Sequence, residues 1–274
     1  MKHILVHLDA SARSADRLTL AQGLAREHQA ALTALYAVVP TLLALPFAGA
    51  AGAESAYAVF EQLDREQRGR ARALFERQLP AGTMAWAETG NELFESTVLQ
   101  HALLADLLVL GQVDPQDGMA GAVPPGFIAT LLTDSGKPAL ILPHTGRFQP
   151  IGREVLLAWK PTREAARAAT AALPWLRQAK SIHLACDTAT RDADRVGSAA
   201  VERWLRLNGV TAPMAVHGLP EQQVGEALLS LAADASADLL VMGCYGHNRL
   251  REWVLGGATR TVLDSMTLPV LMAH

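Results

Sequence analysis

The sequence contains the same short run twice. Residues 105–111 (ADLLVLG) and 237–243 (ADLLVMG) agree at six of seven positions. A helix-like run follows each copy, and a short apolar strand follows that helix. The starts of the two halves agree as well, because each opens with an apolar strand and a helix rich in alanine and arginine. We therefore expect two copies of one unit, at residues 1–146 and 152–274.

Within each copy, fully apolar runs alternate with amphipathic helices. Such runs, for example residues 31–39, indicate strands that are buried on both faces of a parallel sheet. The order predicts an α/β protein of two doubly wound, Rossmann-like domains, each with a five-stranded parallel sheet. In such a fold the ligand crevice lies beyond the carboxyl ends of the strands, where the winding reverses. Strands one and four should flank it, with tips at Asp9 and Gly111 in the first copy and at Lys160 and Gly243 in the second.

Composition argues against several other classes of protein. The 274 residues carry a formal charge of −3, whereas nucleic-acid binders normally carry a basic stripe. The longest apolar stretch, residues 40–53, is interrupted by proline and glycine and is too short to span a bilayer. No secretory signal precedes the first strand. The only cysteines, Cys186 and Cys244, imply no disulfide framework, so we expect a cytoplasmic protein. No spacing resembles a zinc signature, and no metal is predicted.

The second copy continues from its fourth strand into a glycine-rich loop. Gly243 and Gly246 are followed, after nine intervening residues, by Gly256 and Gly257, where a helix begins. Glycine lets the backbone pass close to a ligand, and a helix N-terminus offers free N–H groups to an anion. This arrangement suits a phosphate-bearing small molecule. The alternative is that the glycines only permit tight turns.

With this loop and the order of its elements, the chain resembles a tandem universal stress protein over nearly its whole length. The resemblance implies an adenine nucleotide alpha hydrolase-like fold for each domain. In ATP-binding members, an acid at the end of strand one contacts the nucleoside, and a G-x2-G-x9-G-(Ser/Thr) loop holds the phosphates. The resemblance therefore implies a site for ATP or another phosphate-bearing ligand in the second copy. The site residues carried over are Met242, Gly243, Gly246, Gly256, Gly257, Ala258 and Lys160, with Asp9 as the acid of the first copy.

Both copies depart from that pattern. In the second copy Lys160 stands at the position of the acid, and Gly257 at the position of the hydroxyl residue. An ammonium group only donates hydrogen bonds, so Lys160 either pairs with an anionic ligand or closes the pocket. In the first copy Asp9 keeps the acid, but Asp114 replaces a loop glycine and residues 124–125 are prolines without N–H groups. That loop should repel a triphosphate.

Three further features each have two interpretations. Asp9 is either a ligand contact or, with Ser11, a helix N-cap. Arg249 and Arg251, between the loop glycines, either reach a phosphate or lie on a solvated face. Residues 40–79 make the first copy longer than the second and form either a lid or a surface for a partner.

The sequence thus predicts a non-catalytic binding or signalling module of the stress response. An interaction scaffold that has lost both pockets is one alternative. A slow nucleotide hydrolase is another, but the chain has no P-loop Gly-Lys-Ser/Thr and no second acid for Mg²⁺. As in single-domain relatives, the last strands should pair, here within the chain through residues 140–143 and 271–274. The expected assembly is an intramolecular pseudo-dimer, to which a homodimer can be added, with neither nucleic acid nor membrane as a partner.

Overall fold

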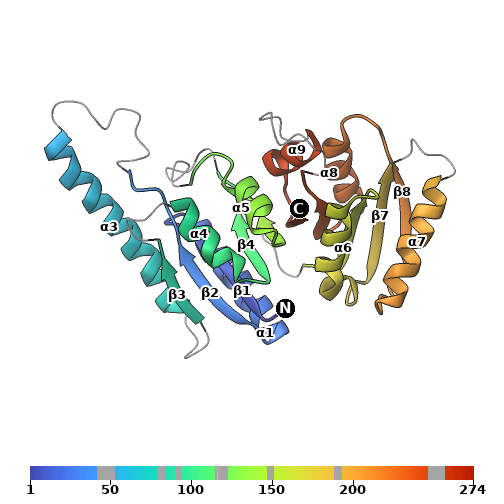
Figure 1. Cartoon of the computed structure of the whole chain (residues 1–274), viewed down its shortest axis with the longest axis horizontal. Helices are drawn as coiled ribbons and strands as arrows, with labels where there is room; N and C mark the ends of the chain where they lie inside the picture. The colour runs from blue at the N-terminus through green and yellow to red at the C-terminus, as the bar shows by residue number, and fades with distance from the viewer. Residues whose placement is uncertain are drawn as a thin grey trace. The chain divides into compact units, whose positions relative to one another are not determined.

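The chain forms an α/β structure that divides into two compact units, unit 1 (Met1–Lys137) and unit 2 (Pro138–His274). Figure 1 shows this computed structural model. It describes residues 1–41, 53–78, 84–89, 94–114, 116, 123–146, 151–187, 193–245 and 257–274. No helix within those ranges is long and apolar enough to cross a membrane.

Unit 1 is built on parallel strands that alternate with helices. The strands are β1 (His3–Leu8), β2 (Ala31–Tyr36), β3 (Met84–Glu88) and β4 (Leu107–Gly111). The helices are α1 (Arg13–His28), α3 (Ala53–Gln78), α4 (Phe94–Leu103) and α5 (Phe127–Ser135). The spatial order β3-β2-β1-β4 reverses direction after β1, so the crevice expected of a doubly wound sheet lies between β1 and β4.

Unit 2 repeats this arrangement. Its strands are β5 (Ala139–Leu142), β6 (Glu154–Trp159), β7 (Ser181–Asp187), β8 (Met214–Leu219), β9 (Leu239–Gly243) and β10 (Val270–Ala273). Its helices are α6 (Arg163–Leu176), α7 (Ala193–Leu207), α8 (Val224–Asp234) and α9 (Gly257–Ser265). The five strands β6 to β10 run parallel in the order β10-β9-β6-β7-β8, with the reversal between β6 and β9. The doubly wound α/β class is therefore confirmed, and the second repeat has the predicted five parallel strands.

Strand β5 has a different direction from the rest of unit 2. It pairs antiparallel with β10, and Leu140 lies opposite Leu271. The repeat in the sequence assigns residues 139–142 to the first copy, whereas the compact unit that contains them begins at Pro138. The boundary between the two compact units therefore lies on the N-terminal side of the expected linker, residues 147–151, because β5 pairs with β10 of unit 2. The pseudo-dimer itself stays a prediction.

The apolar strands form the core of each unit. In β6, Val155, Leu156 and Leu157 are all fully buried, which is what a strand covered on both faces requires. In unit 1 α1 packs against β1, β2 and β4, while α4 packs against α5. In unit 2 α6 packs against β6, β9 and β10, while α8 packs against α9.

The aspartate of the repeated run has the same structural role in both units. Asp106 accepts the N–H groups of residues 2 and 3, at 2.5 and 3.1 Å. Asp238 accepts those of residues 152–154, at 2.6 to 3.3 Å. Each carboxylate therefore satisfies backbone donors where the first strand of its repeat begins.

Replacing Asp238 with alanine should lower the free energy of unfolding by about 1–3 kcal/mol, because backbone N–H groups lose their acceptor. The matched variant Asp238→Asn keeps one acceptor oxygen and should lose less. Urea unfolding followed by tryptophan fluorescence measures both, since Trp159, Trp175 and Trp204 lie in unit 2. Equal stability of Asp238→Ala and the wild type would refute this role.

Candidate functional site

In unit 1 an ion pair lies at the end of β1, beside the tip of β4. Asp9 follows β1, and Arg17 comes from the second turn of α1. Arg17 Nη2 lies 2.8 Å from Asp9 Oδ1, and the two side chains are only 4% and 14% exposed. Arg17 also donates to the carbonyl of His7 at 3.1 Å and to the hydroxyl of Ser14 at 2.8 Å. The guanidinium is thus held by three groups in a buried position.

The side chain of Arg17 also reaches the tip of β4. A Cβ atom placed on Gly111 would lie 2.2 Å from Arg17 Nη1, so no other residue fits at position 111 while the arginine stays there. The arginine therefore fills the space between β1 and β4 that a ligand would need. Arg17 was not predicted as a site residue from the sequence. The signal that could have identified it was its position on α1 among the buried residues Leu18 and Ala21, where a charged residue needs a partner.

Asp9 is held within the protein through one of its two carboxylate oxygens. Its Oδ1 accepts the N–H of Ser11 at 2.9 Å, the hydroxyl of Ser14 at 2.7 Å and the hydroxyl of Ser11. The N-cap residue of α1 is Ala12, and no side chain caps this helix, so Asp9 organises the turn before the helix rather than the cap itself. Burial alone would raise the pKa of Asp9, but Arg17 and the two serine hydroxyls hold it well below its usual range.

The loop after β4 contains the residues at which the first copy differs from the phosphate-binding loop of the family. Asp114 accepts the N–H of Gln116 at 2.9 Å and so closes a local turn. Pro124 and Pro125 precede Gly126, which has a φ of 79° and stands immediately before α5.

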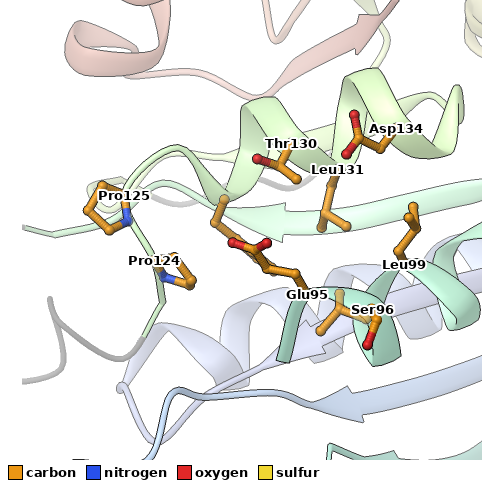
Figure 2. Close-up of a pocket in the computed structure, with 10 residues that line it drawn as sticks. Glu95, Ser96, Leu99, Pro124, Pro125, Thr130, Leu131 and Asp134 are labelled. Atoms are coloured by element: carbon orange, nitrogen blue, oxygen red, sulfur yellow. The ribbon is translucent and has the colours of Figure 1, made fainter. Parts of the chain in front are cut away.

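A groove of about 170 Å³ lies between α4 and α5 (Figure 2). Leu99 on α4 faces Leu131 on α5 across it. Among the described residues that line it, the charged groups are the carboxylates of Glu95 and Asp134. Their charge is of the wrong sign for a phosphate and does not favour a nucleotide here.

In unit 2 the end of β6 is open to solvent. Lys160 is exposed, and the helix that follows is capped by Thr162, whose hydroxyl accepts the N–H of Ala165 at 3.3 Å. The neighbouring Arg163 is 68% exposed. Two cations therefore stand at this end of the strand.

Gly243 at the tip of β9 is needed for packing. A Cβ atom there would lie 2.5 Å from the nitrogen of Ala165 and 2.7 Å from the carbonyl carbon of Glu164. The first turn of α6 therefore rests directly on the end of β9, and only glycine allows this approach. The preceding Met242 is buried in the strand.

The sequence reasoning also missed Glu164, whose side chain is 4% exposed and pairs with Arg163. Burial alone would raise the pKa of Glu164, but hydrogen bonds from Arg163, from its own N–H and from Thr162 lower it overall. Burial and the charge of Glu164 raise the pKa of the Cys244 thiol to about 12. An acid thus lies near the tip of β9, although it comes from α6 and not from β6.

The residues of the predicted glycine loop fall partly inside the described ranges. Helix α9 begins at Gly257, which is exposed, and Ala258 is half-buried. Among the described residues, no atom lies within 4 Å of a Cβ position on Gly257. Before the loop, Tyr245 has a φ of 57°, and its buried hydroxyl has no hydrogen-bond partner in the described part of the chain. Gly246, Gly256, His247, Arg249, Arg251 and Glu252 lie outside the described residues.

The cysteines and the other residues of metal-binding type are the remaining candidates for a site. Cys186 and Cys244 are both buried, and neither forms a disulfide. Within the described ranges, no three residues of the types His, Cys, Asp and Glu are grouped as metal ligands.

Comparison with known proteins identifies related sequences and folds. The model of the "Universal stress protein family" matches residues 213–274. Universal stress protein Slr1230 of Synechocystis sp. is 44% identical over 46 residues, which is 17% of this chain and 16% of that protein. A universal stress protein from Archaeoglobus fulgidus has the same fold, with a TM-score of 0.64, 15% identity, and 99% and 97% of the two chains covered. A protein of unknown function, PA1789 from Pseudomonas aeruginosa, gives a TM-score of 0.60 at 17% identity, over 100% of this chain and 92% of that one.

Replacing Asp9 with alanine should destabilise unit 1 by about 3–5 kcal/mol at pH 7, because Arg17 is left as a buried charge without its partner. The double variant Asp9→Ala/Arg17→Met, which removes both charges, should recover most of that loss. Urea unfolding at pH 7 measures the three proteins. A double variant no more stable than Asp9→Ala would contradict the assignment of the loss to the unpaired arginine.

The Asp9–Arg17 pair also predicts that the free energy of unfolding depends on pH. Because the folded-state pKa of Asp9 is depressed, its stabilisation is fully present above the unfolded pKa, about 3.9, and is lost as the pH falls through the lower folded value. The stability gap between the wild type and Asp9→Ala should therefore narrow below about pH 4. A gap that stays constant from pH 7 to pH 3 would show that Asp9 does not act through its charge.

Proposed function

Because this chain belongs to the universal stress protein family, we propose that it is a non-catalytic ligand-binding module of the stress response. Unit 2 would bind a small ligand through its phosphate group, and an adenine nucleotide is the first ligand to test. Unit 1 would serve as a structural or partner-binding companion.

The first turn of α9 is the observation that carries this proposal. Gly257 is exposed, no atom of the described residues lies within 4 Å of its Cβ position, and the helix that it begins has nine residues. The N–H groups of such a first turn have no partners within the helix and carry the positive end of its dipole. Thr259, at 5% exposure, has its side chain turned into the protein. A phosphate here would thus be held by the backbone at Gly257 and Ala258, not by a hydroxyl group.

Two neighbouring features fit a polar, anionic ligand. The buried hydroxyl of Tyr245, which lacks a partner in the described part of the chain, stands where the chain leaves β9 for the loop. Lys160 and Arg163 are exposed at the end of β6, which pairs with β9. Exposure of Lys160 favours its interpretation as a partner for an anion over that of a plug.

Several properties favour binding over catalysis. The Cys244 thiol is 1% exposed and its pKa is raised to about 12, so it is a poor nucleophile at neutral pH. Glu164 is held by Arg163, by Thr162 and by its own N–H, and is not free to act as a base. A ligand bound here would be released chemically unchanged. The signal would be the fraction of protein molecules that carry the ligand.

Unit 1 supports the second hypothesis, a scaffold. Its crevice contains the Asp9–Arg17 pair, and an incoming phosphate would have to displace Asp9 from the guanidinium. Asp114 adds a second carboxylate to the loop beyond β4. Unit 1 is therefore better suited to contact another protein than to bind a nucleotide.

Isothermal titration of the full chain with ATP and Mg²⁺ tests the proposal. The wild type should bind one equivalent with a Kd on the order of micromolar, about −8 kcal/mol. Gly257→Asp places a negative charge at the open turn and should weaken binding by about tenfold or more, since a charge at a helix N-terminus acts on an anion directly. Gly257→Ala is the matched control, because it adds the same Cβ atom without charge and should bind like the wild type.

The outcomes separate the two hypotheses. No heat at millimolar ATP, with inorganic phosphate and AMP also silent, would reject the phosphate site and favour the scaffold. Binding that Gly257→Asp leaves unchanged would place the nucleotide elsewhere. Release of phosphate from ATP at a rate that depends on Mg²⁺ would instead favour the hydrolase.

A further inference from the structure

Two histidines of unit 2 face each other on neighbouring strands. His183 lies on β7 and His217 on β8, and both are half-buried. Nδ1 of His183 is 3.0 Å from Nε2 of His217, and the ring centroids are 5.1 Å apart with an interplanar angle of 30°. Two ring nitrogens thus face each other at hydrogen-bond distance.

The register of the strands explains how they meet. His183 is opposite Ala215, and His217 is opposite Ala185, so the two histidines are diagonal neighbours on the same face of the sheet. The residues between them are alanines, which leave room beside the rings. β8 is the last strand in the order of unit 2, and Figure 1 shows it beside β7. The exposure of Ala215 shows that solvent reaches this part of the sheet.

In the metal-free protein one ring must donate its N–H to the other, because two unprotonated nitrogens repel. Imidazole nitrogens are also good ligands for divalent copper, nickel and zinc. We propose that His183 and His217 form a two-nitrogen site for a divalent transition metal ion of the copper and nickel class. The site is independent of the phosphate ligand proposed for unit 2.

The distance between the nitrogens is compatible with joint binding of one metal ion. With metal–nitrogen bonds of about 2.0–2.1 Å, two ligands at adjacent corners of a square or octahedron lie about 2.9 Å apart. The same bonds in a tetrahedron give about 3.3–3.4 Å. The 3.0 Å of the hydrogen-bonded pair lies within about 0.4 Å of both values, so only a small movement is needed. Copper(II) is the first ion to test, because it binds a given set of nitrogen ligands more tightly than the other divalent ions of its row. To bind one metal ion, the two rings must rotate until both nitrogens point to one position beside the line of their hydrogen bond.

The surroundings support an open, two-ligand site. Within the described ranges no third His, Cys, Asp or Glu completes a cluster, so water would fill the other coordination positions. Burial, and then the neighbouring His183, lowers the pKa of His217. The site would therefore bind metal without a large rearrangement of the sheet.

Titration of the untagged full chain with copper(II), followed by calorimetry and electron paramagnetic resonance, tests the inference. The wild type should bind one more copper ion per chain than His183→Ala or His217→Ala, with two equatorial nitrogens in the spectrum of that ion. Each single variant should weaken this site by about a hundredfold, the usual gain from joining two ligands. The double variant should be no weaker than either single one, because one histidine alone does not chelate. His101→Ala, which removes a half-buried histidine on α4, is the matched control and should bind like the wild type.

Thermal unfolding of each variant, measured without metal, tests whether the variant is folded. If an alanine variant is not folded, the glutamine variant at the same position, His183→Gln or His217→Gln, is used in its place. The inference is overturned if the number of bound copper ions is the same in the wild type and in both folded variants. It is also overturned if His101→Ala loses the same ion, since the difference would then not belong to this pair.

Discussion

The close approach of the first helix of each repeat to the tip of its fourth strand determines what each crevice can contain. In unit 1 the side chain of Arg17 lies where a Cβ atom of Gly111 would be, and in unit 2 the backbone of Glu164 and Ala165 lies where a Cβ atom of Gly243 would be. A glycine at both strand tips is therefore a packing requirement first. The chemistry of each site then depends on which groups the helix brings to that point.

The two units bring opposite charges there. Unit 1 has its acid, Asp9, on the strand end and its cation, Arg17, on the helix, and the two pair with each other at 2.8 Å. Unit 2 has the cation, Lys160, on the strand end, while the buried acid, Glu164, comes from the helix and pairs with Arg163. The first arrangement neutralises itself and fills its own crevice. The second leaves Lys160 exposed. The proposed division into a structural unit and a binding unit rests on this difference.

The fold was largely predictable, and the site was only partly so. The repeat and its continuous apolar runs indicated the parallel strands, the point of reversal and the crevice, because burial on both faces leaves a clear pattern in a sequence. Arg17 and Glu164 were missed because a charge in an amphipathic helix is usually exposed, and only packing shows that these two are not. His183 and His217 are 34 residues apart, and only the register of β7 and β8 brings them to 3.0 Å. Gly246 and Gly256 lie outside the described residues, so their predicted roles stay predictions.

The central claim is that unit 2 binds a phosphate at the start of α9 while unit 1 is closed by its own ion pair. The most direct test is an amide NMR titration of the isotope-labelled chain with ATP and Mg²⁺, repeated with inorganic phosphate. The account predicts concentration-dependent shifts at the N–H groups of Gly257 and Ala258, with no change at Ser11 and Gly111. Shifts confined to Ser11 and Gly111, with Gly257 and Ala258 unmoved, would contradict it.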